Sequence, residues 1–165
     1  MCGIFGFLGK KNQQSKEDLI VMKNSLNHRG PDHFDFYSLE VGREYSVNLG
    51  HVRLSIIDTS SAGNQPMHSQ SGRFTIVFNG EIYNFLDIKK EIEERLPQVL
   101  WKGSSDTEVL LAGFELFGLQ ECVSKLVGMF AFSLWDNEQQ KFFLVRDRIG
   151  EKPLYYGFQG DQLVF

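Results

Sequence analysis

The order in which strand and helix patterns follow one another is the feature that most constrains the fold of this chain. Strand patterns occupy residues 3–8, 34–39, 45–57 and 73–78 and, after two helix patterns, residues 129–135, 141–145, 153–158 and 163–165. Several neighbouring strands are joined by connections of hairpin length, which parallel strands cannot use. The sequence therefore predicts an α+β fold in which antiparallel sheets and helices are segregated.

Three helices are expected from their capping residues and the spacing of their apolar positions. The first starts at the capping box Ser15–Asp18 and stops before the loop at residues 28–32, where Gly and Pro end a helix. The others are expected to run from Asn84 to Pro97 and from Ser105 to Gly118. A polar loop is expected from residue 58 to residue 71.

Length and charge exclude several classes of protein. A chain of 165 residues fits one domain, and 17 basic against 21 acidic residues give a net charge of −4. The acidic balance argues against a nucleic-acid binder, which needs a basic face. Fifteen Phe residues indicate a wide, flat interior such as that between facing sheets.

The two cysteines, Cys2 and Cys122, lie far apart and imply no disulfide framework, so we expect a cytosolic setting. No apolar run approaches the ~18 residues of a membrane span. The N-terminus has no basic segment of a signal peptide. The chain stops inside the apolar strand pattern at residues 163–165, which suggests a fragment of a longer protein.

Common cofactor and metal motifs do not stand out. The Gly-Lys-Lys sequence at residues 9–11 lacks the Ser or Thr and the upstream Gly of a phosphate loop. The four histidines show no metal-ligand spacing. We therefore expect no metal and no bound cofactor in this domain.

Cys2 is a candidate nucleophile because of its position. After removal of Met1, Cys2 would carry both a thiol and a free α-amino group. Such an amine titrates near pH ~8 and can act as the base for the thiol without a histidine. The alternative is a small, buried apolar residue at the start of a strand, which is the usual fate of a free cysteine. Position alone leaves both interpretations open.

Attack on a carbonyl also requires an oxyanion site, for which Asn79 and Gly80 could supply a side-chain amide and a backbone N–H. The alternative is a type I′ hairpin turn, for which Asn-Gly is a strong signal. The segment after Gly80 leads into a helix rather than a second alternating strand, which favours a strand-to-helix turn that presents Asn79.

Arg53 and Asp106 are suited to binding the carboxylate and the amino group of an amino acid. Arg53 lies in an apolar run, so the alternative is an arginine on the solvated face of a strand. Asp106 lies in the first turn of the third expected helix, where favourable capping is the alternative. Spacing alone does not show that the two side chains meet.

Eight segments spread along the whole chain carry a family resemblance. They are residues 1–6 (Met-Cys-Gly-Ile-Phe-Gly), 28–32 (His-Arg-Gly-Pro-Asp), 50–58, 64–67 (Asn-Gln-Pro-Met), 79–84 (Asn-Gly-Glu-Ile-Tyr-Asn), 104–109, 128–132 and 146–156. In this order they resemble the class II glutamine amidotransferase domain of the N-terminal nucleophile (Ntn) hydrolase type. The similarity is greatest to the glutaminase half of glutamine-hydrolysing asparagine synthetases.

The resemblance implies a four-layer αββα sandwich and a role for each matching residue. Cys2 would be the nucleophile that hydrolyses L-glutamine through a γ-glutamyl thioester, and Asn79 and Gly80 would form the oxyanion site. Arg53 would bind the α-carboxylate of glutamine, and Glu81 and Asp106 its α-amino group. Ile56 and Ile57 would line the pocket through their backbone. The signatures at residues 29–32 and 146–155 receive no catalytic role.

The resemblance also implies a partner: a C-terminal synthetase domain that binds ATP and magnesium and uses the ammonia. Its acceptor is aspartate or another carboxylate, such as that of a sugar acid. No nucleic acid or membrane is expected as a partner, and a homodimer is one option for the assembly. A catalytically silent glutamine-binding or regulatory module, and a peptidase of the same superfamily, are the competing functions.

Overall fold

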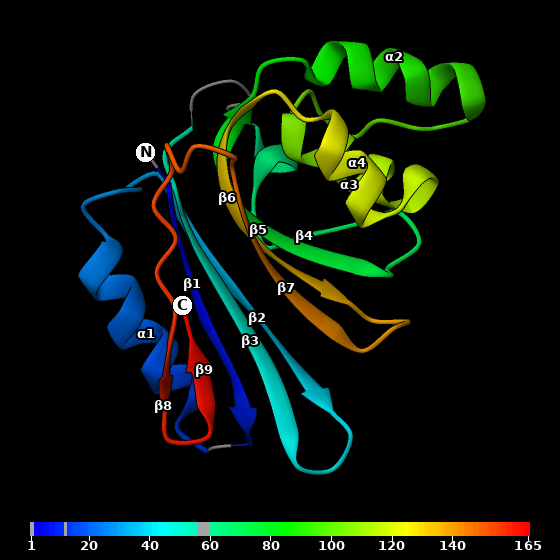
Figure 1. Cartoon of the computed structure of the whole chain (residues 1–165). Helices are drawn as coiled ribbons and strands as arrows, with labels where there is room; N and C mark the ends of the chain where they lie inside the picture. Colours follow the sequence, from blue (N-terminus) through cyan, green and yellow to red (C-terminus); the bar gives the residue numbers. More distant parts are fainter. Residues whose placement is uncertain (1, 12, 56–59) are drawn as a thin grey trace.

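The computed structural model describes residues 2–11, 13–55 and 60–165 of the chain (Figure 1). The elements are β1 (Gly3–Lys10), α1 (Ser15–Leu26), β2 (His33–Val41), β3 (Tyr45–Arg53), the 3-10 turn η1 (Ser61–Gly63), β4 (Met67–His68), β5 (Phe74–Ile82), α2 (Phe85–Arg95), α3 (Asp106–Phe117), α4 (Leu119–Lys125), β6 (Gly128–Asp136), β7 (Lys141–Arg146), β8 (Gly157–Gln159) and β9 (Gln162–Val164).

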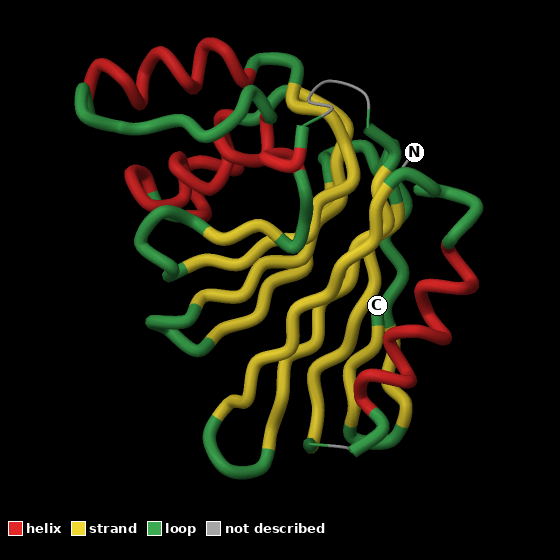
Figure 2. The backbone as a smooth tube through the Cα atoms, turned by 180° about the vertical axis from the view of Figure 1, so that it is seen from behind, coloured by secondary structure: helices red, strands yellow, loops and turns green. Residues whose placement is uncertain are grey.

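The strands form two sheets that lie face to face between layers of helices. One sheet has the order β2-β3-β1-β9-β8 and the other the order β4-β5-β6-β7, and every pairing is antiparallel. Figure 2 shows α1 outside the first sheet and the remaining helices outside the second. The predicted α+β, four-layer αββα sandwich is therefore confirmed.

Apolar side chains fill each of the three spaces between these layers. On β3, Val52 faces α1 with Leu19, whereas Val47 and Leu49 face the second sheet, as the two-residue period of a strand requires. The third space, between the second sheet and α2 to α4, holds most of the buried aromatic rings, among them Phe132. The large phenylalanine core thus lies between sheet and helices more than between the two sheets.

Several local expectations were wrong. The N-cap of α1 is Gln14, one residue before the expected Ser15, because the Asp18 N–H already bonds to the carbonyl of Gln14. Asn84 is the N-cap of α2, but its side chain donates to the Lys125 carbonyl and accepts from the Val127 N–H instead of capping the helix. Asn84 therefore links α2 to the segment after α4.

Strand boundaries also differ from the prediction. β3 was expected to run to residue 57, but it ends at Arg53 and residues 54 and 55 are not in a strand; residues 56 and 57 lie outside the described part of the chain. The strand expected at residues 153–158 is confined to Gly157–Gln159. The expected polar loop at residues 58–71 contains η1 and β4, and α4 was not expected at all. At Ser105 the prediction is confirmed, since its side chain accepts a hydrogen bond from the Glu108 N–H.

The helix-facing core makes a large contribution to stability. Leu110 on α3 is 1% exposed, so Leu110→Ala leaves a cavity and is expected to lower the free energy of unfolding by about 2–5 kcal/mol. Leu100, 75% exposed, is the matched control, for which a change within about 0.5 kcal/mol is expected. Urea unfolding followed by circular dichroism measures both. Equal losses in the two variants would contradict this account of the core.

Candidate active site

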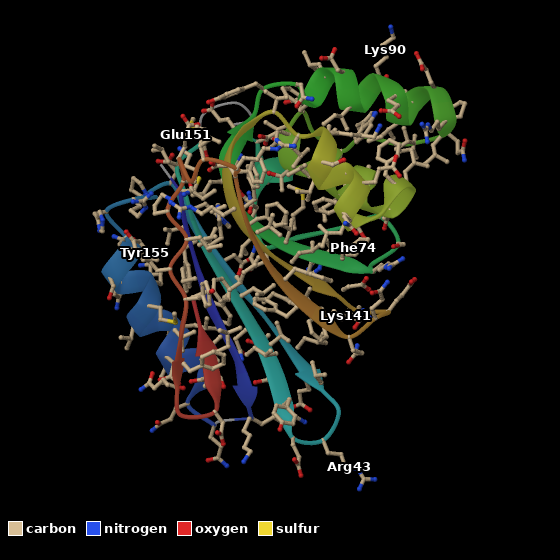
Figure 3. All side chains as sticks on the ribbon, viewed as in Figure 1. Arg43, Phe74, Lys90, Lys141, Glu151 and Tyr155 are labelled. Atoms are coloured by element: carbon tan, nitrogen blue, oxygen red, sulfur yellow. The ribbon has the colours of Figure 1, made fainter. Side chains whose placement is uncertain are left out.

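The candidate site lies at one end of the sandwich, where both sheets and α3 meet. Cys2 precedes β1, Arg53 ends β3, Asn79 lies near the end of β5, and Asp106 begins α3. Glu151, labelled in Figure 3, lies at this end of the molecule, whereas Arg43 in the β2–β3 turn marks the opposite end. In antiparallel sheets the start of one strand lies beside the end of its neighbour, so residues far apart in the sequence come together at this end of the molecule.

One cavity of about 90 Å³ collects six of the eight residues that the sequence singled out. They are Cys2, Arg53, Asn79, Gly80, Glu81 and Asp106. The remaining two, Ile56 and Ile57, lie outside the described residues. Arg53 and Asp106, whose spacing left open whether they meet, thus line the same cavity.

The Cys2 thiol is held against the backbone of Leu54, the residue after Arg53. Sγ donates to the Leu54 carbonyl at 3.6 Å and accepts from the Leu54 N–H at 3.4 Å. The Cys2 carbonyl accepts from Arg29 Nε at 3.1 Å. Cys2 is only partly buried, so the alternative of a sealed core cysteine is not supported, and the thiol lines the cavity.

The loop at residues 28–32 is part of this architecture, although no role was assigned to it in the sequence analysis. Besides the bond from Arg29 to Cys2, the Asp32 N–H donates to the Arg53 carbonyl and the Asp32 carboxylate accepts from the Ser55 N–H. The loop therefore fixes the nucleophile candidate and the end of β3 relative to each other. Only the tertiary structure brings these segments together.

Asn79 and Gly80 are not in a turn. β5 continues through both to Ile82, and they pair with Ala131 and Phe130 of β6. Both the hairpin turn and the strand end predicted at this point are therefore wrong, because pairing with β6 overrides the local turn preference of Asn-Gly. A Cβ atom at Gly80 would overlap the backbone of β6, which explains why glycine is needed here.

Arg53 is buried, so the alternative of a solvated strand arginine is wrong. It is 7% exposed, and its Nη1 donates to the Asn64 side-chain oxygen at 2.7 Å and to the Ser60 carbonyl at 2.8 Å. A guanidinium carries five N–H donors in a planar arrangement that suits a carboxylate, and Arg53 lines the cavity. Its orientation in the cavity depends on the segment that follows residue 60.

Asp106 and Glu81 form an acidic wall of the same cavity. Burial of the Asp106 carboxyl raises its pKa, and the nearby charge of Glu81 acts in the same direction, while hydrogen bonds from the Ile82 and Thr107 backbone oppose the shift. Two carboxylates close together favour a cation between them. Together with Arg53, the cavity offers opposite charges to the two ends of an α-amino acid.

Lys152 is a further cavity residue to which the sequence assigned no role. It is buried and lies on a loop organised by Asp147, whose carboxylate accepts from the N–H groups of Phe130, Glu151 and Lys152. Burial alone would raise the pKa of Asp147, but these hydrogen bonds outweigh it and hold the pKa below its usual value. The Arg146–Tyr156 signature thus shapes the cavity wall.

A second, more apolar cavity of about 340 Å³ shares Cys2 and Asn79 with the first. It is lined by side chains of α1, including Met22 and Leu26, and by Leu154 and Tyr155. Tyr155 is labelled in Figure 3 on the side of the molecule that carries α1. The thiol therefore lies between a charged pocket and an apolar one.

No group of three or more metal-ligating side chains gathers anywhere in residues 2–11, 13–55 and 60–165. Within the same part of the chain, no helix combines the length and apolar character that crossing a bilayer requires.

Comparison with solved structures defines the class of the fold. The glutamine phosphoribosylpyrophosphate amidotransferase from B. subtilis superposes with a TM-score of 0.81 at 22% identity, covering 99% of this chain and 41% of the other. The chain thus has the fold of an Ntn-type amidotransferase.

The chain belongs to the glutamine amidotransferase domain family, whose sequence pattern matches residues 1–165. It is 35% identical to a putative asparagine synthetase (glutamine-hydrolysing) 2 of Methanocaldococcus jannaschii, covering 100% of this chain and 33% of that protein. Asparagine synthetase (glutamine-hydrolysing) 3 of Bacillus subtilis is 38% identical, with coverage of 100% and 26%. The amidase chry2 of Gibberella zeae is also 38% identical, with coverage of 99% and 25%. The chain therefore spans about a quarter to a third of the length of these relatives.

Proposed function

We propose that this domain hydrolyses L-glutamine to L-glutamate and ammonia at Cys2. The observation that supports this most is the single cavity in which a partly exposed thiol, an arginine and two carboxylates face the same space. This charge pattern matches the carboxylate and ammonium of a free amino acid. A long peptide has neither charge at an internal residue, which argues against a peptidase.

In the proposed reaction, removal of Met1 frees the α-amino group of Cys2, which takes the thiol proton. The sulfur then attacks the side-chain carbonyl carbon of glutamine, so that a C–S bond forms and the carbonyl π electrons move to oxygen. The Asn79 side chain and the Gly80 N–H stabilise this oxyanion. When the oxyanion collapses, the C–N bond breaks and the nitrogen leaves as ammonia with the transferred proton.

A water molecule completes the turnover. It attacks the γ-glutamyl thioester, the C–S bond breaks, and glutamate and the free thiol are released. The α-amino group serves as the base both when the thioester forms and when it is hydrolysed, so the reaction requires no histidine. This domain then needs no metal or bound cofactor, which stays a prediction.

The most direct test is incubation of the purified domain with glutamine, after mass spectrometry has shown that Met1 is removed. Formation of equal amounts of glutamate and ammonia is expected. A folded, correctly processed domain that binds glutamine but forms no glutamate would instead be a silent binding module.

We further propose that the ammonia serves an ATP-dependent amidation in a longer, asparagine-synthetase-like protein, with ATP and magnesium bound outside this domain. Support comes from the names and lengths of the relatives. Three aromatic side chains are exposed at this end of the chain and offer a surface for an additional domain: Tyr155 lines the second cavity, and Tyr156 and Phe158 line another cavity that shares Leu154 with it. Asparagine formation from aspartate in the longer protein tests this acceptor against other carboxylates. The cytosolic setting and a homodimer stay predictions.

As the pH is lowered, glutamine binding is expected to weaken. The weakening should begin at a higher pH than it would if Asp106 had the pKa of an ordinary aspartate. The pKa of Asp106 is raised above its usual 3.8 by burial. As the pH falls, Asp106 is therefore neutralised early and stops attracting the substrate ammonium. Calorimetric titration of glutamine into the non-hydrolysing Cys2→Ala protein measures this directly.

Asp106→Asn is the control for that titration. Its amide oxygen still accepts from the Ile82 N–H, but the charge is gone, so affinity at neutral pH should be about 10- to 100-fold lower. Its affinity should also vary less with pH. If both proteins show the same affinity and the same pH profile, Asp106 does not bind the ammonium.

A further inference from the structure

Two adjacent polar residues, Asn64 and Gln65, connect the elements that carry the candidate glutamine site. They form a strap that follows η1 and leads into β4, beside the end of β5. Neither residue was singled out individually by the sequence, although both belong to the Asn-Gln-Pro-Met segment of the family resemblance.

Asn64 acts on the carboxylate-binding side of the site. Its side-chain oxygen accepts from Arg53 Nη1 at 2.7 Å. The same Nη1 donates to the Ser60 carbonyl. Residues 60–64, which join the two acceptors, form a turn. It is closed by hydrogen bonds from the Ala62 N–H to the Ser60 side chain and from the Asn64 N–H to the Ser61 carbonyl. Nη1 of Arg53, a residue that lines the candidate glutamine site, is therefore held by two acceptors of this short turn.

Gln65 acts on the oxyanion side of the site. Its buried side-chain oxygen accepts from the Phe78 N–H at 2.6 Å, one residue before Asn79, and its amide nitrogen donates to the Thr107 hydroxyl at 3.4 Å. Because Thr107 follows Asp106, one side chain links the strand that carries Asn79 to the helix that carries Asp106.

His51 binds the other backbone polar group of Phe78. Its Nε2 lies 3.2 Å from the Phe78 carbonyl. Burial, with the charge of Arg53 in the same direction, lowers the pKa of His51 to about 3, so the ring is neutral and donates from Nε2 at any working pH. The backbone before Asn79 is thus fixed on its N–H by Gln65 and on its carbonyl by His51.

The strap lies between two cavities. Gln65 lines the 90 Å³ cavity of the candidate site, whereas Asn64 lines another cavity of about 400 Å³ between η1, α3 and residues 96–102. Hydrogen bonds to Arg53, Phe78 and Thr107 tie the strap to the elements of the site.

We propose that Asn64 and Gln65 are positioning residues of the glutamine site: Asn64 orients Arg53 toward the substrate carboxylate, and Gln65 holds the Phe78–Asn79 backbone in the geometry that stabilises the oxyanion. This inference rests on the proposed glutamine hydrolysis. It assigns the two neighbours different kinetic effects, because Arg53 contributes to binding whereas Asn79 contributes to the transition state.

Steady-state kinetics of Asn64→Ala and Gln65→Met test the assignment. Asn64→Ala should raise KM for glutamine about 10-fold with little change in kcat. Gln65→Met, which keeps the length but loses the acceptor for the Phe78 N–H, should lower kcat about 10-fold with little change in KM. Ser61→Ala, an exposed change in the same segment, is the control and should alter neither constant. Thermal unfolding of each variant sets an assay temperature at which all are folded.

A second measurement separates positioning from a general structural effect. The loss caused by Asn64→Ala should disappear with the glutamine α-amide, which lacks the carboxylate, and in an Arg53→Ala background, where there is no guanidinium to orient. Equal losses with both substrates, additive effects with Arg53→Ala, or the same kinetic pattern in both strap variants would overturn the inference.

Failure of the proposed function gives a different result. If the wild-type domain releases no glutamate, glutamine hydrolysis is refuted, while calorimetric affinities for glutamine still test Asn64. A 10-fold weaker affinity in Asn64→Ala, absent in Ser61→Ala, would support its part of the inference, and an unchanged affinity would refute it.

Discussion

Cys2→Ala is expected to abolish glutamine hydrolysis, with a loss in kcat on the order of 10⁴-fold or more, while the fold stays intact. Loss of a nucleophile removes the covalent route, and only binding and oxyanion stabilisation remain. The variant retains a small residue after Met1, and the two hydrogen bonds that the Cys2 thiol makes with Leu54 are long and weak, so little stability is lost with them. Glutamate formation and circular dichroism are measured on the same sample.

Cys122 provides the matched control. It is fully buried under α3, and burial raises the pKa of its thiol to about 12, so it is not reactive at neutral pH. Cys122→Ala should keep its activity, and alkylation of the wild-type protein should modify Cys2 and not Cys122. Turnover that survives Cys2→Ala, or is lost in Cys122→Ala at a temperature where it is folded, would contradict the mechanism.

Asn79→Ala is expected to lower kcat by about 10²–10³-fold, the usual effect of removing one oxyanion donor. KM should change little, because the donor acts on charge that develops only in the transition state. The backbone pairing of Asn79 with Ala131 does not depend on the side chain, so the strand should persist. Steady-state kinetics over a range of glutamine concentrations separate the two constants.

Asn137→Ala is a suitable comparison for Asn79→Ala. Asn137 is exposed in the turn between β6 and β7, at the far end of the strand that pairs with Asn79. Its replacement should leave kcat unchanged. A similar kcat for Asn79→Ala and the wild type would place the oxyanion site elsewhere, and a large rise in KM alone would make Asn79 a binding group.

The layers of the fold could be predicted from the sequence because they depend on local patterns. Strand alternation and hairpin-length connections between residues 129–145 determine antiparallel pairing, and Ser105 and Gly118 mark the ends of α3 as expected. The seven-residue α4 was missed, since its short pattern contains too few turns to show helical periodicity. Its one buried residue, Cys122, packs beside Gly113 of α3, a tertiary contact that the local sequence does not show.

Six candidate residues that the sequence analysis named line one cavity, but their surroundings could not be predicted. Asn79-Gly80 has the local composition of a turn, and only pairing with β6 keeps it in a strand. Arg53 looks like a solvated strand residue until Asn64, eleven positions away, accepts its hydrogen bond. Gln65 belongs to the Asn-Gln-Pro-Met segment of the resemblance, but no local pattern indicated its role, because its partners Phe78 and Thr107 are distant in sequence.

Detection of the acyl-enzyme tests the central claim most directly. The processed domain is mixed with glutamine, quenched in acid and digested, and the N-terminal peptide is analysed by mass spectrometry. A mass increase equal to one γ-glutamyl group on Cys2, removed by hydroxylamine and absent in Cys2→Ala, is the predicted result. Glutamate formation with no adduct on Cys2 in any rapidly quenched sample, or an adduct on another residue, would contradict the account.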